Sequence, residues 1–121
     1  MFIAYDVSLE VIQQLRIVMP AIKRADRNLA DQIGRAATSV SLNLAEGNCR
    51  TGGDRRRMFE IAHGSAAEVR AAIAVGVSWG WIEEPGALLA VVDRLMAILW
   101  RLTRGQAVHS AQGPGRLATK A

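Results

Sequence analysis

Glu60 and His63 are the pair of residues best suited to chemistry, because they form a Glu-x-x-His motif. On a helix their side chains lie one turn apart on one face, where a carboxylate and an imidazole can bind the same metal ion. A dimetal site in a helical bundle needs two such motifs and two more inward-facing carboxylates. The other histidine, His109, has no glutamate three residues before it. A metal-dependent enzyme is therefore the weakest hypothesis, and His63 is expected to be a neutral residue at the helix surface or core boundary.

No other arrangement of reactive residues points to catalysis. Cys49 lies next to a turn without a designated base, and none of Ser39, Ser41 and Ser65 has histidine and aspartate partners in the sequence. The Gly52-Gly53 pair lacks the lysine of a phosphate-binding loop. We therefore expect a protein that is not an enzyme and that needs neither a cofactor nor a metal ion.

Polar residues form a stripe along the second predicted helix. Four of them fall within about 80° of one another at 100° per residue, namely Arg35, Ser39, Asn43 and Glu46. Glu60 and Glu68 share a face of the third predicted helix in the same way. Because both stripes border the apolar faces, we expect Arg35 to donate to Glu60 or Glu68, with Ser39 and Asn43 completing the network. The network is interpreted as structural, fixing the helix register; a ligand site and an intersubunit interface are the alternatives.

Basic side chains are concentrated in two parts of the chain. Residues 22–57 hold eight basic and four acidic side chains, and residues 85–121 hold five basic and one acidic side chain. Such zones favour a polyanion such as nucleic acid, although a solvated surface is the alternative explanation. The candidate nucleic-acid-binding residues are Lys23, Arg24, Arg27, Arg55, Arg56, Arg57, Arg94, Arg101 and Arg104.

The manner of binding follows from what surrounds these basic residues. Arg55, Arg56 and Arg57 open a predicted helix, where cations oppose the helix dipole, and this indicates an anionic partner. Arg94, Arg101 and Arg104 fall within about 80° of one another and would form a ridge on the fourth predicted helix. Aromatic residues are not interleaved with them. We therefore expect contacts to the phosphate backbone that are salt-sensitive and show little sequence specificity.

Four amphipathic helices must position these residues. Apolar residues recur every three or four positions over about residues 6–20, 28–48, 55–79 and 86–105. Ser8 and Asp54 are predicted N-caps, Pro20 is predicted to end or kink the first helix, and Pro85 to open the fourth. Because the turns are short, the helices should pack as an all-α, up-and-down antiparallel four-helix bundle over residues 1–105. Residues 106–121 are predicted to be a flexible C-terminal tail.

We expect a single-domain protein that is located in the cytoplasm. The 121 residues fit one domain, and half of them are apolar, which is enough for a core without disulfides. The lone Cys49 is expected to be half-buried in a reducing compartment. No signal peptide is evident, and the weakly polar stretch over residues 71–82 is too short to span a bilayer. Trp79 and Trp81 in that stretch are expected at a buried helix end.

The polar stripe belongs to a longer run that resembles a known family signature. The run is Leu29-Ala-Asp-Gln-Ile-Gly-Arg-Ala-Ala-Thr-Ser-Val-Ser-Leu-Asn-Leu-Ala-Glu-Gly47, and a second block reads Phe59-Glu-Ile-Ala-His-Gly-Ser-Ala-Ala-Glu68. Both resemble the four-helix bundle family of the 23S ribosomal RNA intervening-sequence protein, over about residues 6–105. The sequence departs from the family pattern at two places. Gly34 stands where the family more often has a larger residue, and no acidic residue follows soon after Pro20.

This resemblance implies a non-enzymatic homopentamer. Relatives of the family include the accessory variability determinant proteins of diversity-generating retroelements, which bind nucleic acid and work with a reverse transcriptase. The leading hypothesis is thus an oligomer that binds RNA or DNA through its basic surface. The alternative is a structural or adaptor oligomer that docks a partner protein and has no direct role with nucleic acid.

Overall fold

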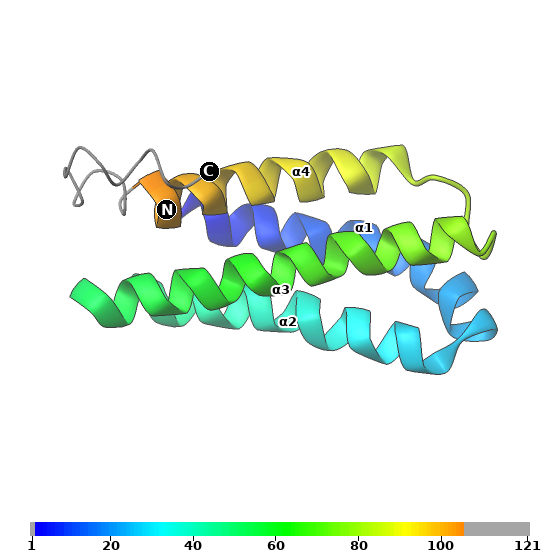
Figure 1. Ribbon diagram of the computed structural model, residues 1–121, viewed down its shortest axis with the longest axis horizontal. Coiled ribbons are helices and arrows are strands. Elements are labelled where there is room, and N and C mark those ends of the chain that lie inside the picture. The colour runs from blue at the N-terminus through cyan, green and yellow to red at the C-terminus, as the bar shows by residue number, and fades with distance from the viewer. Residues whose placement is uncertain (1, 106–121) are drawn as a thin grey trace, which may run out of the picture.

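A computed structural model describes residues 2–105 of the chain, and these residues fold into four long helices. The helices are α1 (Ile3–Ala25), α2 (Arg27–Asn48), α3 (Gly52–Ser78) and α4 (Gly86–Trp100), and one π-helical turn, η1 (Arg101–Gly105), continues α4. Consecutive helices run antiparallel (Figure 1), with α1 against α2 and α4, and α3 against the same two neighbours. Residues 2–105 contain no strand. The predicted all-α class and four helices are confirmed; the predicted tail lies outside the described residues.

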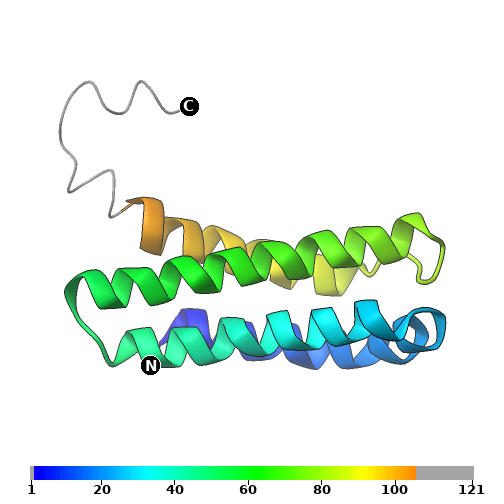
Figure 2. The same cartoon turned by 60° about the horizontal axis from the view of Figure 1, so that its bottom comes forward.

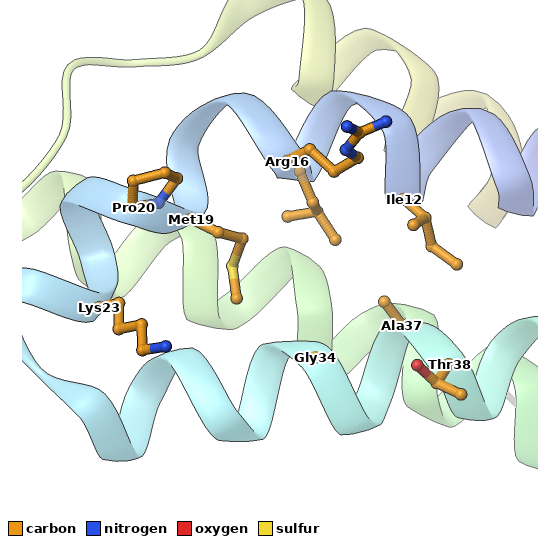
Figure 3. Close-up of a pocket in the computed structure, with 9 residues that line it drawn as sticks. Ile12, Arg16, Met19, Pro20, Lys23, Gly34, Ala37 and Thr38 are labelled. Atoms are coloured by element: carbon orange, nitrogen blue, oxygen red, sulfur yellow. The ribbon is translucent and has the colours of Figure 1, made fainter.

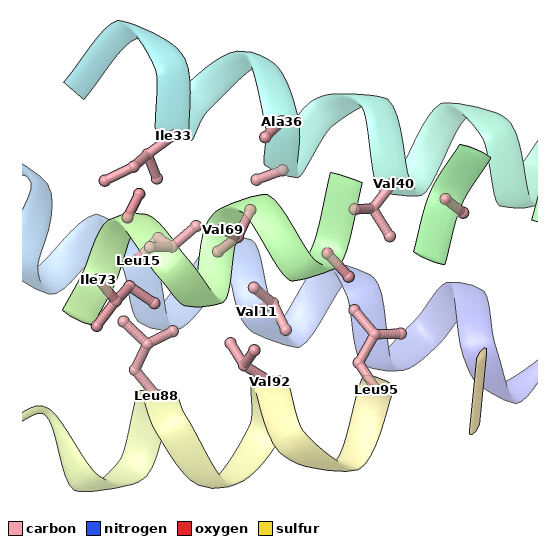
Figure 4. Packing of buried hydrophobic residues seen from close by; sticks show 14 of the residues in the cluster. Val11, Leu15, Ile33, Ala36, Val40, Val69, Ile73, Leu88, Val92 and Leu95 are labelled. Carbon is pink, nitrogen blue, oxygen red and sulfur yellow. The ribbon is translucent and has the colours of Figure 1, made fainter. Parts of the chain in front are cut away.

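The core runs along the axis between the four helices (Figure 4). Each helix contributes residues at three- and four-residue spacing, which is the pattern of an apolar stripe. Side chains that are almost fully buried include Val11, Leu15, Ile33, Val40, Leu44, Val69, Ile73, Leu88, Val92, Leu95 and Leu99. Phe59 is also fully buried, whereas its neighbour Met58 is only half-buried.

Both predicted limits of α1 are wrong. Ser8 does not cap the helix, which begins five residues earlier at Ile3; it is a buried interior residue. Pro20 does not end the helix, because α1 continues to Ala25, and the alternative of a kink at Pro20 stays a prediction. Proline removes one backbone hydrogen bond. The turn beyond it persists because Ile22, two residues later, is completely buried and packs in the core.

Ser8 instead links α1 to α2 inside the bundle. Its hydroxyl donates to the carbonyl of Tyr5 over 2.6 Å and lies 2.8 Å from the hydroxyl of Ser41, which is also buried. A hydroxyl has a single hydrogen. Because Ser8 gives its hydrogen to Tyr5, Ser41 must be the donor in the bond between the helices.

Replacement of this buried pair tests its contribution to stability. We expect Ser8→Ala to lower the free energy of unfolding by about 1–2 kcal/mol, because the Ser41 hydroxyl loses its acceptor. The Ser8→Ala/Ser41→Ala double variant should lose less than the sum of the two single losses, since neither hydroxyl is then left unpaired. Urea unfolding measures both, with the exposed Ser78→Ala as control. Additive losses would mean that the two hydroxyls do not interact.

The other helix ends differ from the predicted caps. Asp26 caps α2, because its carboxylate accepts from the backbone amide of Leu29 over 3.0 Å. Asp54 is not a cap: α3 begins at Gly52, and the carboxylate lies in the first turn, where it is favourable to the helix dipole. Pro85 precedes the first residue of α4 rather than occupying it. These shifts are of one to three residues.

Cys49 and Trp79, near the two ends of α3, are more exposed than predicted. Cys49 is exposed in the turn before α3, not half-buried. Trp79 is 69% exposed and stacks on Trp81, with ring centroids 5.7 Å apart, so the predicted buried helix end is wrong. Gly80 between them has φ +79, which allows the chain to reverse there. None of the described helices is both long and apolar enough to cross a membrane.

Candidate functional site

The polar stripe of α2 makes a short hydrogen-bond chain to α3. The Asn43 amide donates to the backbone carbonyl and the hydroxyl of Ser39, over 2.8 and 3.1 Å. The Ser65 hydroxyl on α3 donates to the Ser39 hydroxyl over 3.0 Å. All three side chains are half-buried. A polar contact at this depth favours one register of the two helices, because sliding either helix would leave these groups unpaired.

The charged members of the predicted network lie apart from this chain. Arg35 is exposed and makes no hydrogen bond or ion pair with Glu60 or Glu68, contrary to the prediction. Glu46 pairs over 2.6 Å with Arg50, which follows the end of α2. Glu68 is also exposed. Helical spacing places residues on a face but does not show how far each extends, and long charged side chains gain solvation by turning outward.

Arg55 has a structural role at the start of α3. Its guanidinium donates to the carbonyl of Gly47 over 3.2 Å and lies 4.8 Å from the centre of the Phe59 ring. It therefore satisfies a carbonyl at the C-terminus of α2, where a cation is favourable to the helix dipole. The unfavourable interaction of Arg55 with the dipole of α3 is thus offset by its favourable interaction with the C-terminus of α2. The position of Arg55 therefore does not require an anionic partner.

Arg56 and Arg104 line a common cavity between α3 and η1. The cavity has a volume of about 390 Å³, and its other lining residues are Glu60, His63, Gly64 and Thr103. The Arg56 Nε atom lies 3.4 Å from a carboxylate oxygen of Glu60. This pair is not aligned as a hydrogen bond, and Nε is buried without a hydrogen-bond partner among the described residues. The Glu-x-x-His pair therefore shares its cavity with two guanidinium groups.

His63 is half-buried in this cavity. Burial lowers its pKa below the usual range for histidine, and the positive charge of Arg104 lowers it further. The imidazole is accordingly neutral at pH 7. Residues 2–105 contain no group of three or more His, Cys, Asp and Glu side chains that could hold a metal ion. Because two guanidinium groups and only one carboxylate line the cavity, its charge favours an anion over a cation.

The π-helical turn explains the position of Arg104. Arg94 faces α1 and lies 3.9 Å from Glu10, whereas Arg104 faces α3 across the cavity. A π turn holds more residues than an α turn, so the angles that place Arg94, Arg101 and Arg104 on one ridge do not apply beyond Trp100. The predicted single ridge is therefore wrong for Arg104, and Arg101 is exposed beside it.

The remaining candidate arginines divide between the two ends of the bundle. The α2–α3 turn and η1 lie at one end (Figure 2), which gathers Arg50, Arg55, Arg56, Arg57, Arg101 and Arg104. The carboxylates near the same end of the bundle are Asp6 at the start of α1, Glu46 at the end of α2, and Asp54 and Glu60 in the first part of α3. Lys23, Arg24 and Arg27 are exposed at the opposite end, where Asp26, Glu83 and Glu84 offset them. Among residues 2–105, the basic side chains named at the first end outnumber the carboxylates, whereas those at the second end equal them.

A groove between α1 and α2 forms an apolar hollow on the side of the bundle. It has a volume of about 480 Å³, and Figure 3 shows Ile12, Met19 and Ala37 on its walls with Arg16 and Lys23 at the rim. A second hollow continues it along α2 through Gly34 and Thr38 to Leu42, whose side chain is 63% exposed.

Comparison with known proteins identifies related chains. The model of the family described as 23S rRNA-intervening sequence protein matches residues 3–100. The chain is also similar to the crystal structure of a protein of unknown function from the S23 ribosomal protein family of Bacteroides thetaiotaomicron VPI-5482. That similarity has a TM-score of 0.70 at 18% identity and covers 82% of this chain and 96% of the other. At such identity it shows the fold alone. No curated protein matches the chain.

Proposed function

Because the chain belongs to the 23S rRNA-intervening sequence protein family, we propose that it is a non-enzymatic homo-oligomer that binds RNA or DNA through the arginine-rich end of its bundle. The observation that carries this proposal is the meeting of Arg56 and Arg104 around one cavity, from segments almost fifty residues apart. The exposed Arg57 and Arg101 lie in the same two turns and make no ion pair with another described residue. Arginine is well suited to phosphate, which it binds through parallel N–H donors.

The proposed binding is to the phosphate backbone. Trp100, next to Arg101, is 51% exposed, but no exposed aromatic side chain lies among the arginines of the α2–α3 turn, so base stacking can supply only a small part of the contacts. Contacts to phosphates release counterions, and the logarithm of the association constant then falls by about 0.9 per phosphate contact for each tenfold increase in salt. The affinity should therefore be strongly salt-dependent and differ little between sequences.

Fluorescence anisotropy with a labelled duplex and a structured RNA tests this proposal. We expect binding at about 50 mM salt that weakens steeply as salt increases. Arg57→Gln/Arg101→Gln should bind more weakly and reduce the salt slope by about 2, since each lost phosphate contact removes about 1. The matched control is Arg24→Gln/Arg27→Gln, which removes the same charge from the opposite end. Absence of binding at low salt, or equal losses in both variants, would contradict binding at the arginine-rich end.

Self-association is the second part of the proposal, and we infer a homopentamer from the family. The apolar hollows along α1 and α2 and the exposed Leu42 support a contact with another copy, because a contiguous apolar surface of this kind is costly in water. Native mass spectrometry should find five copies of the 13.1 kDa chain. Leu42→Glu should shift the protein to smaller species, and a monomer at micromolar concentration in the unaltered protein would contradict the inference.

The adaptor hypothesis makes a different prediction in the same assays. An oligomer that only docks a partner protein would assemble normally but would bind neither the duplex nor the RNA at low salt. Its partner would remain associated after nuclease treatment and in high salt, because protein contacts need no phosphate.

A further inference from the structure

We infer that the cavity between α3 and η1 is a binding site for a phosphate monoester. The site is formed by Arg56, His63 and Arg104, with Glu60 as the only carboxylate among its lining residues. Two sources share this chemistry, namely the phosphorylated end of a nucleic-acid strand and a free phosphate or nucleotide. Occupancy by a strand end rests on the proposed function, whereas affinity for inorganic phosphate does not.

The first argument is the hydrogen-bonding state of the cavity. Arg56 Nε is buried and carries a hydrogen, but the Glu60 carboxylate, 3.4 Å away, is not aligned to accept it as a hydrogen bond. Buried donors in folded proteins are almost always well paired, so this poor pairing indicates that the Arg56 side chain can serve a further acceptor. The His63 ring makes no hydrogen bond with another described residue, although it lines the same cavity. An acceptor in the cavity would therefore meet one poorly paired guanidinium and one unpaired imidazole.

The second argument is the balance of charge. The charged groups around the cavity are Arg56 and Glu60 on α3 and Arg104 on η1. With His63 neutral, they leave one positive charge without a partner in the cavity. A phosphate monoester carries about −1.5 to −2 charges at pH 7 and several strong acceptor oxygens. It would more than neutralise this charge, and the remaining negative charge would favour protonation of His63. Its oxygens would accept from the guanidinium groups and the imidazole.

The third argument is space. Gly64 contributes no side chain to the wall, and a methyl group added there would meet no atom within 4 Å. The volume of about 390 Å³ lies within the range of small-molecule sites. A phosphate with an attached sugar therefore fits, whereas the internal phosphate of a duplex carries bulk on both sides. This distinction favours a terminal phosphate over a backbone phosphate.

The test is nuclear magnetic resonance of the His63 imidazole during titration with inorganic phosphate at constant ionic strength, with chloride as the reference anion. We expect saturable movement of the His63 signals and an increase of its pKa, because a bound dianion favours the protonated ring. By linkage, phosphate should bind more tightly as His63 becomes protonated. Signals that respond equally to phosphate and chloride would overturn the site.

Matched variants locate the effect. Arg104→Gln should weaken phosphate binding about tenfold or more, since it removes a charge-assisted hydrogen bond. Arg35→Gln removes the same charge from an exposed position on α2, outside the cavity, and should leave binding unchanged. Equal losses in the two variants would mean that only net charge matters, which would also overturn the site.

Two oligonucleotides of one sequence identify the source of the phosphate. If the site takes strand ends, the 5′-phosphorylated strand should move the His63 signals at lower concentration than inorganic phosphate, and the 5′-hydroxyl strand should not. Equal potency of the phosphorylated strand and inorganic phosphate would support a site for free phosphate monoesters. Failure of all these probes, with duplex binding retained in the anisotropy assay, would overturn this site while leaving the proposed function intact.

Discussion

Phe59→Ala is expected to lower the free energy of unfolding by about 3–5 kcal/mol. The ring is fully buried at the end of the bundle that carries the arginines. It packs against Gly47 of α2, lies 5.7 Å from the Phe2 ring at the start of α1, and supports the Arg55 guanidinium. Truncation removes contacts with the start of α1 and the end of α2 and leaves a cavity that a rigid backbone cannot close.

Thermal and urea unfolding measure this loss. The control is Ile61→Ala, two residues later on α3, where the side chain is 38% exposed and should contribute much less. A domain of this size has a total stability of about 5–15 kcal/mol. Phe59→Ala therefore removes a large share of it, and a loss no greater than that of Ile61→Ala would contradict the packing described for this end.

Gly47→Ala is expected to destabilise the protein by about 1–3 kcal/mol, against the usual trend for glycine in a helix. Alanine is normally favoured over glycine within a helix by about 0.5–1 kcal/mol. Here a β-carbon would lie 2.7 Å from the Phe59 ring and 3.0 Å from the Met58 β-carbon. Neither neighbour can yield easily, because one is a fully buried ring and the other is fixed to the backbone.

The comparison variants separate this clash from helix propensity. Gly64→Ala on α3 places its methyl group in open space and should stabilise the protein slightly. In the Phe59→Ala background the two closest contacts are gone, so the added cost of Gly47→Ala should fall to what the Met58 β-carbon still imposes. If Gly47→Ala is destabilising by the same amount in both backgrounds, contact with Phe59 is not its cause.

These two residues connect stability to the proposed site. The contact between Gly47 and Phe59 sets the distance between α2 and α3 near the start of α3, where Arg55 and Arg56 lie. A change in this packing would move Arg56 relative to Arg104 on η1. We therefore interpret the close approach at Gly47 as a requirement of the arginine-rich end as well as of the core.

The helical pattern predicted the architecture well. Period-3.6 spacing of apolar residues is local and strong in all four segments, so the class, the helix number and most core residues follow from the sequence. Helix ends were predicted less well, because a cap needs only one residue and tertiary packing can extend a helix past it. Ser8 and Pro20 show this, since burial of Ala4, Val7 and Ile22 keeps α1 helical on both sides of the predicted limits.

The candidate site could be predicted only in part. Residue types alone picked out Arg56, His63 and Arg104, but in three separate contexts: a basic cluster, a metal motif and a ridge. Their meeting depends on η1, whose π turn has no signal in the pattern, and on antiparallel contact between segments far apart in the chain. The predicted pairing of Arg35 with Glu60 or Glu68 was wrong, because the pattern places Arg35 on a face of the helix but cannot show that its side chain remains in solvent.

By itself the sequence determined that this protein is a helical bundle of one family with basic zones and no evident catalytic set, because periodicity, composition and motif spacing are properties of neighbouring residues. Only the tertiary structure decided which arginines are used internally and which face a common cavity. The reason is that a guanidinium can reach a helix end, a carboxylate, an aromatic ring or solvent with similar ease, and the choice among these depends on what the fold places beside it. Arg55 on Gly47 and Arg104 beside His63 are two such outcomes.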